Sequence, residues 1–185
     1  MKRAFLFALF LAACQEEVVQ NTDPLPLTPE TLGHFCQMNL LEHEGPKGQV
    51  HLDGLPGAPL FFSQVSDLVT YLRLPEQTNA VLAIYVSDMG ADDATWEQPG
   101  AANWTDARTA TYVVGSDATG GMGAPELVPF ADPTEADAFA ALHGGTPMTL
   151  EAIPDSAITP VAAGGREGED DYSDRLKSLA GGSEG

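Results

Sequence analysis

The first half of the chain carries short apolar runs separated by Gly and Pro, a pattern typical of strands joined by tight turns. Four runs predict strands, at residues 35–41, 49–52, 60–62 and 81–86. Before the fourth run, apolar residues recur at the i, i+3, i+4, i+7 spacing of one helix face: Val65, Leu68, Val69 and Leu72. We expect a helix of about ten residues here, with Ser63 as its N-cap and Pro75 ending it.

The second half repeats this order. Strands are expected at residues 110–114, 127–130 and 148–153, and a helix at residues 136–142. Asp132 and Thr134 favour a helix start, and Gly144-Gly145 favours a helix stop. Both halves then follow the order strand, strand, helix, strand.

This order predicts an α+β fold of two small ββαβ modules packed together, at residues 33–90 and 91–155. The halves match in the order of elements and not in residues, so a duplicated module is a hypothesis.

The ends of the chain differ from this globular pattern. Basic residues and an apolar run at residues 1–13 are typical of a lipoprotein signal peptide, with lipid attached to Cys14. The apolar run is shorter than the roughly 20 residues that span a bilayer. Residues 14–32 are expected to form a tether, and residues 156–185 a disordered acidic tail.

The charge of the chain narrows the choice of partners. Eight basic and 27 acidic residues give a net charge of −19. Nucleic acid and anionic membrane surfaces repel such a chain, so we expect no nucleic-acid partner.

Cys36 is the cysteine left without a disulfide partner once Cys14 is acylated. If residues 35–41 form a strand, Cys36 and Met38 point to the same face. A thiolate beside a thioether favours copper(I) over zinc, calcium or magnesium. The alternative is that both side chains pack in the core, as free Cys and Met often do.

Three further residues are candidate ligands. Met122 lies in a glycine-rich loop, where a large apolar side chain has little local packing, although an incidental Met in a hairpin turn is the alternative. Met89 is a second thioether near a turn. His143 ends the second helix, where an interaction with the helix dipole is an alternative to metal binding.

The sequence lacks the motifs of common hydrolases and nucleotide-binding enzymes. It contains no Gly-x-Ser-x-Gly, no phosphate-binding glycine loop and no His-Glu-x-x-His. We therefore expect a binding protein and not an enzyme.

Taken in order, the motifs resemble those of the NosL family, the lipoprotein accessory factors of nitrous oxide reductase. The resemblance covers about residues 33–155 and depends on these features: the lipobox Leu11-Ala12-Ala13-Cys14, Cys36-x-Met38, Phe62-Ser63, Met122-Gly123 and Phe139 with His143-Gly144-Gly145.

The resemblance implies a copper(I) chaperone with two ββαβ modules. Such proteins pass copper to the maturation machinery of nitrous oxide reductase, which includes an ABC-type membrane complex. Carried over by residue, Cys36, Met38 and Met122 match the metal-binding positions, and Met89 and His143 are further candidates. Many members have Gly between the Cys and the Met, where this chain has Gln37.

Other functions stay open at this stage. They are a general copper-sequestering lipoprotein, a structural lipoprotein without metal, and a thiol-dependent lyase or reductase, which would need a second thiol. The expected location is a cell-envelope membrane, facing the periplasm. Gln15 after the lipidated cysteine favours the outer membrane.

Overall fold

The computed structural model describes residues 19–158, which form two antiparallel sheets and two helices. The first sheet has the order β2-β1-β3-β4, with strands Leu60–Phe62, Gly48–Leu52, Val81–Ser87 and Trp104–Asp106. The second has the order β6-β5-β7, with strands Val128–Phe130, Thr111–Val114 and Thr146–Thr149. The helices are α1 (Val65–Arg73) and α2 (Pro133–His143), and three short 3-10 turns are η1 (Leu40–Glu42), η2 (Leu150–Ala152) and η3 (Asp155–Ala157).

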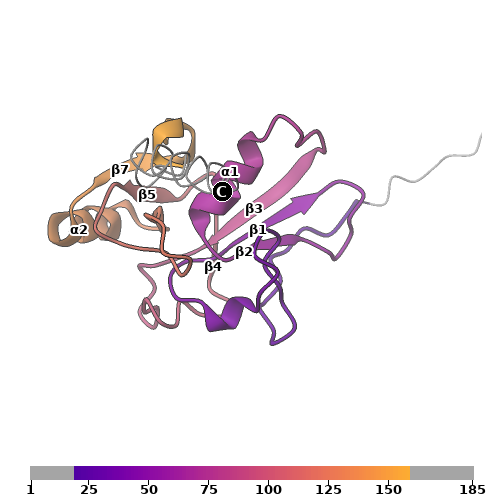
Figure 1. Cartoon of the computed structure of the whole chain (residues 1–185), viewed down its shortest axis with the longest axis horizontal. Helices are drawn as coiled ribbons and strands as arrows, with labels where there is room; N and C mark the ends of the chain where they lie inside the picture. The colour runs from indigo at the N-terminus through magenta and orange to yellow at the C-terminus, as the bar shows by residue number, and fades with distance from the viewer. Residues whose placement is uncertain (1–18, 159–185) are drawn as a thin grey trace, which may run out of the picture.

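The predicted α+β class is confirmed. The elements run β1-β2-α1-β3 and then β5-β6-α2-β7, and the second sheet lies with α2 at one end of the molecule (Figure 1). β4 lies between the two series and pairs with β3, so the first sheet includes a strand beyond residue 90. The division into modules at residues 33–90 and 91–155 stays a prediction. The signal peptide, Cys14 and residues 159–185 of the predicted tail lie outside the described residues.

Three local predictions are wrong. Residues 35–41 form a turn that leads into η1, and not a strand. The N-cap of α1 is Gln64 in place of Ser63. The last strand is Thr146–Thr149, and the chain then tightens into η2 where residues 148–153 were expected to stay extended.

One core joins the two sheets. Val50, Phe62 and Leu68 of the first sheet and α1 pack in the same buried cluster as Tyr112 of β5 and Leu127 beside β6. Burial of such apolar side chains contributes about 1.5–3 kcal/mol each. The two sheets therefore share a hydrophobic core and stabilise each other.

β5 is buried on both faces. Successive strand residues point to opposite sides of a sheet, so Tyr112 enters the shared core while Val113 packs under α2 with Phe130 and Ala136. The Tyr112 hydroxyl donates to the Ala107 carbonyl at 2.7 Å, which satisfies the polar end of this buried ring.

The described chain begins with an extended segment held along β1. The Gln20 side chain donates to the Leu52 carbonyl at 3.0 Å. Gln49, which is fully buried, accepts from the Leu25 amide and donates to the Leu25 carbonyl, both at 3.0 Å. Residues 20–25, inside the predicted tether, are therefore bound to the sheet.

α2 has the predicted start and stop. The Asp132 carboxylate accepts from the Thr134 amide at 2.8 Å, and Pro133 occupies the first turn. Gly144 and Gly145 both have positive φ, of 74° and 88°, so the backbone there needs glycine.

These two glycines provide a matched pair of variants. Gly144→Ala introduces only backbone strain, because its Cβ would meet no atom within 4 Å, and we expect a loss of about 1 kcal/mol. Gly145→Ala adds a clash, with its Cβ 2.8 Å from the Ser116 nitrogen, and we expect about 2–4 kcal/mol in all. Urea denaturation of both variants measures the difference. Equal losses would contradict the close approach of the two backbones.

Candidate metal centre

Cys36 and Met38 lie in a tight turn before η1. The turn is closed by hydrogen bonds from the Gln37 amide to the Gly33 carbonyl, at 2.9 Å, and from the Gly33 amide to the Met38 carbonyl, at 3.0 Å. Asn39 then caps η1, because its side chain accepts from the Leu41 amide. The turn at Gln37 and the cap at Asn39 prevent the extended backbone that was predicted for residues 35–41. The sulfurs of Cys36 and Met38 therefore do not share a strand face.

Gln37 stabilises this turn with its own side chain. Its φ of 56° is the one positive value of a non-glycine residue in the part of the chain that the structure describes. An L-residue in this conformation costs about 1–2 kcal/mol. The Gln37 amide group offsets part of this cost by donating to the carbonyls of Gly33, at 3.2 Å, and His34, at 2.8 Å. These bonds explain how Gln can occupy a position that favours Gly.

The turn is fastened to the first sheet and α1 through His34. Its backbone amide donates to the Phe61 carbonyl at 2.7 Å. Its ring packs against Phe62 and Tyr71, with ring centroids 5.7 and 5.3 Å apart. His34 therefore packs against β2 and α1, two residues before the free thiol.

Cys36 is a half-buried free thiol. A Cβ atom at position 33 would lie 2.5 Å from the Cys36 sulfur, so the missing side chain of Gly33 makes room for it. Among the groups that act on Lys47 electrostatically is Cys36. A buried ammonium group therefore lies within electrostatic range of the thiol.

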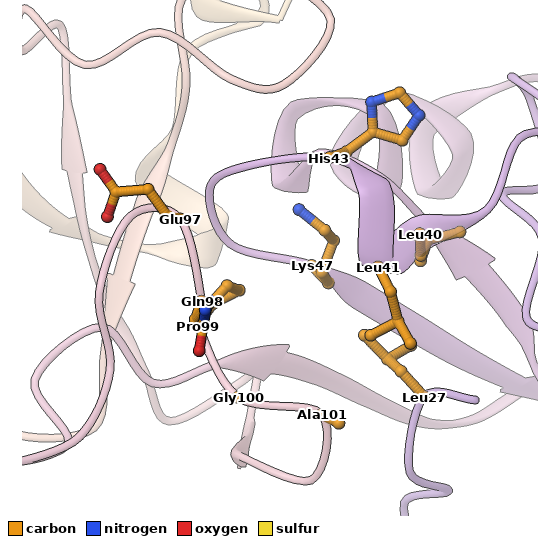
Figure 2. A pocket seen from close by; sticks show the side chains of 10 residues that line it. All are labelled: Leu27, Leu40, Leu41, His43, Lys47, Glu97, Gln98, Pro99, Gly100 and Ala101. Atoms are coloured by element: carbon orange, nitrogen blue, oxygen red, sulfur yellow. The ribbon is translucent and has the colours of Figure 1, made fainter. Parts of the chain in front are cut away.

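Lys47 is 1% exposed and is the last residue of the loop that joins η1 to β1. Its Nζ donates to the carbonyls of Glu44, at 2.8 Å, and Gly45, at 2.5 Å, and Figure 2 shows the amine directed toward this loop. Burial lowers the pKa of Lys47 to about 8, and the negative charges of Glu126, Glu44 and Cys36 oppose that shift. The ammonium group thus stabilises the loop through hydrogen bonds to two of its carbonyls.

Figure 2 also shows the cavity beside Lys47, of about 330 Å³. It is lined by Leu27, Leu40, Leu41, His43, Lys47, Glu97, Gln98, Pro99, Gly100 and Ala101. None of the candidate ligands lines it, so it is a different place from the sulfur-bearing segments.

The segment that carries Met122 lies against the same loop. The Met122 backbone amide donates to the side-chain oxygen of Gln64, in the first half of the chain, at 3.0 Å. The neighbouring Gly121 lies against the loop, since a Cβ there would be 2.8 Å from the Glu44 carbonyl oxygen. Gly121 and the Lys47 ammonium group therefore both approach the Glu44 carbonyl of the loop from His43 to Lys47.

The thioethers of Met38 and Met122 are open to solvent. Met38 is 40% exposed and Met122 is 46% exposed. These values argue against the alternative that Met38 packs in the core. Large exposed apolar side chains surround the Cys36 turn as well: Leu32, Phe35 and Leu41.

Glu126, which sequence reasoning missed, ties the second half of the chain to α1. Its buried carboxylate accepts from the amides of Val65, Ser66 and Leu127, at 3.3, 3.0 and 2.8 Å. It thereby caps a helix N-terminus that the Gln64 side chain leaves uncapped. Burial raises the pKa of Glu126 to about 7, against the lowering effect of these hydrogen bonds and of Lys47.

Met89 and His143 lie elsewhere. Both line a cavity of about 630 Å³ with Asp117 and Trp96, and neither Cys36 nor the other two sulfurs line it. His143 Nδ1 lies 3.0 Å from the Asp117 carboxylate, and its ring stacks on Phe139. The structure thus brings Met89 and His143 to one cavity, which Glu44 of the loop beside Gly121 also lines.

The remaining donor chemistry is narrow. Within residues 19–158, no three His, Cys, Asp or Glu side chains come together in a group that could hold a metal ion. A metal site at the Cys36 turn would therefore depend on thiolate and thioether sulfur, which are soft donors that suit copper(I).

In the same described range, no helix is long and apolar enough to cross a membrane.

The chain matches known proteins over most of its length. The NosL family model matches residues 24–158. The chain is 55% identical over 172 residues to the copper-binding lipoprotein NosL of Achromobacter cycloclastes, covering 91% of this chain and 89% of the relative. It is 34% identical over 168 residues to the copper-binding lipoprotein NosL of Stutzerimonas stutzeri, covering 89% of this chain and 84% of that one.

A solved structure extends the likeness to the fold. The crystal structure of the copper chaperone NosL from Shewanella denitrificans matches with a TM-score of 0.67 and 29% sequence identity. The match covers 74% of this chain and 98% of the other.

The fold and these relatives define a non-enzymatic class of α+β binding proteins, which agrees with the missing enzyme motifs. Within that class, this chain belongs to the NosL family.

Glu126 makes stability depend on pH. Its pKa is about 7 in the folded state and 4.5 when unperturbed, so ionisation opposes folding. The penalty is absent below pH 4.5, grows as pH rises toward 7 and then stays, at about 3 kcal/mol. Glu126→Gln removes this titration. We expect the free energy of unfolding of the variant, relative to wild type, to rise by about that amount between pH 4.5 and 8.

The difference between the two proteins is the quantity to measure by urea denaturation, because other groups titrate in the same range. Burial lowers the pKa of His51, which gives the opposite slope, and this contribution is common to both proteins. Parallel stability curves would show that Glu126 does not titrate in this window.

Proposed function

We propose that this chain binds one copper(I) ion through Cys36, Met38 and Met122 and carries it as cargo to the maturation machinery of nitrous oxide reductase. The observation that carries the proposal is the pair of half-exposed thioethers: Met38 is two residues from the Cys36 thiol, and Met122 follows Gly121, which lies against the loop from His43 to Lys47. The names of the relatives, copper-binding lipoprotein and copper chaperone, support it.

The donor types suit a carrier. A thiolate supplies the negative charge that holds a monovalent ion, and neutral thioethers add soft donors without further charge. Because both Met side chains are solvent-exposed, an acceptor protein could replace them one at a time. Met89 and His143 remain predicted ligands; they line another cavity, and we leave them out of the proposed set.

We further propose that lipid on Cys14 anchors the protein to the outer membrane, facing the periplasm. The family relatives are lipoproteins by name, and Gln15 follows the proposed lipidation site. The proposed recipient of copper is the ABC-type complex of the reductase machinery, reached through the exposed turn around Cys36.

A copper(I) titration against a competing chelator, under anaerobic conditions, tests the ligands. We expect one tight site, weakened by about 100-fold or more in Cys36→Ser and by about tenfold in Met122→Leu, or about 2.7 and 1.4 kcal/mol. Leucine keeps the volume of Met122 and removes its sulfur. Met148→Leu is the matched control, because Met148 packs against the core on β7.

Met89→Leu and His143→Ala belong in the same series, and we expect their affinity to stay near wild type. Unaltered binding by Cys36→Ser would remove the proposed site. A strong loss in His143→Ala alone would move the site to the second cavity.

Delivery is tested separately in a strain that lacks this chain. We expect nitrous oxide reductase to be made there without its full copper content, and wild type but not Cys36→Ser to restore it. The readouts are the copper content of the purified reductase and copper tolerance of the cells. Normal reductase with reduced tolerance would favour copper sequestration over delivery.

A further inference from the structure

We infer that the end of the first sheet where the described chain begins is a membrane-contacting face, and that the candidate copper site points away from the bilayer. The inference rests on the proposed lipidation of Cys14. Its partner is the headgroup surface of the anchoring membrane.

The N-terminal segment of the described residues is fixed along the first sheet. Residues 20–25 are bound to β1 through the Gln20 bond to Leu52 and the paired bonds between Gln49 and Leu25. Further on, the Leu27 amide donates to the Ala101 carbonyl at 2.7 Å. The segment therefore runs along β1 in the opposite direction, and its free end is at the Leu52 end of the strand (Figure 1).

Only a short length of chain separates this segment from the proposed lipid on Cys14. Five peptide units separate Cys14 from Val19, and a fully extended chain spans at most about 3.6 Å per residue, or about 18 Å. The folded part has a radius of gyration of about 14 Å by the usual scaling with chain length. A body with that radius of gyration is at least about 28 Å across, so the available reach is shorter than the width of the domain and the Leu52 end must stay close to the lipid.

The surface at the Leu52 end of β1 exposes large apolar side chains. Val19, Leu55 and Leu82 are large apolar side chains with exposed fractions of 90%, 42% and 39%. Val19 and Leu82 line one shallow cavity together with Pro56, the neighbour of Leu55. Apolar side chains at a headgroup boundary gain from partial burial, at about 25 cal/mol per Å². Asp53 lines the same cavity, which favours zwitterionic over anionic lipid.

The candidate copper site lies near the other end of β1, at Gly48. β1 runs from Gly48 to Leu52, about 14 Å at the rise of an antiparallel strand. His34, two residues before Cys36, donates to the carbonyl of Phe61, which pairs with Gln49 at the Gly48 end of β1. The Cys36 turn is therefore at the end of the strand opposite to the chain exit, where a soluble or membrane-bound acceptor can approach it.

The test uses the full-length lipidated protein in phosphatidylcholine vesicles, with Cys36→Ser as background so that a single nitroxide label can be placed. Labels go on Leu55→Cys and Leu82→Cys at the proposed face, and on Met38→Cys as the matched exposed control. The measurement is the paramagnetic effect of a nickel-chelating lipid in the headgroup layer. We expect a several-fold stronger effect at 55 and 82 than at 38.

Equal effects at all three labels, or a stronger effect at 38, would overturn the orientation. Flotation of the vesicles separates this result from failure of the anchor, because Cys14→Ser should stay in solution. If the unaltered Cys14 protein does not float, the anchor and this inference both fail. A flexible Gly/Ser insertion after residue 18 should weaken the effect at 55 and 82, and an unchanged effect would show that chain length does not set the orientation.

Discussion

The hydrogen bonds of the buried Glu126 carboxylate hold the two halves of this protein in register. They join the N-terminus of α1, in the first half, to the strand region that begins at Leu127 in the second. The same residues fix the glycine-rich loop, because Gly120 approaches both Gln64 and Glu126 too closely for any side chain. The position of Met122 relative to the first sheet therefore follows from an ionisable group that belongs to the fold and not to the candidate site.

This arrangement gives the proposed copper site a divided structure. Cys36 and Met38 come from a turn that His34 fastens to β2 and α1, while Met122 comes from a loop fastened to Gln64. A change of packing between the two halves would move the sulfurs relative to each other without breaking either turn, so the geometry of the site depends on the shared core.

Sequence reasoning succeeded where the signal was local. The strands at Gly48–Leu52 and Val81–Ser87 follow from apolar runs bounded by Gly and Pro, and α2 from Asp132 and the two glycines. It failed where distant residues decide the structure. Nothing near Ser63 shows that a carboxylate 63 positions away will cap α1, and β4, with the sequence Trp-Thr-Asp, lacks the apolar run that marks the equally short β2 and β6. At the candidate site, the residue types were readable, but the assumed strand at residues 35–41 was wrong. Cys36 and Met38 lie in a turn that Gln37 closes, and the sequence offers no periodicity that would reveal it.

The side chain of Gln37 has a consequence for the timing of copper exchange. It closes the Cys36 turn with two hydrogen bonds to the chain that precedes it, and no metal is needed for either. The conformational entropy of the turn is then lost when the protein folds and not when the ion arrives. A turn that keeps its shape when empty neither gains much order on loading nor loses much on release, so the barrier to handing over the ion would lie in exchange of sulfur ligands and not in refolding of the donor.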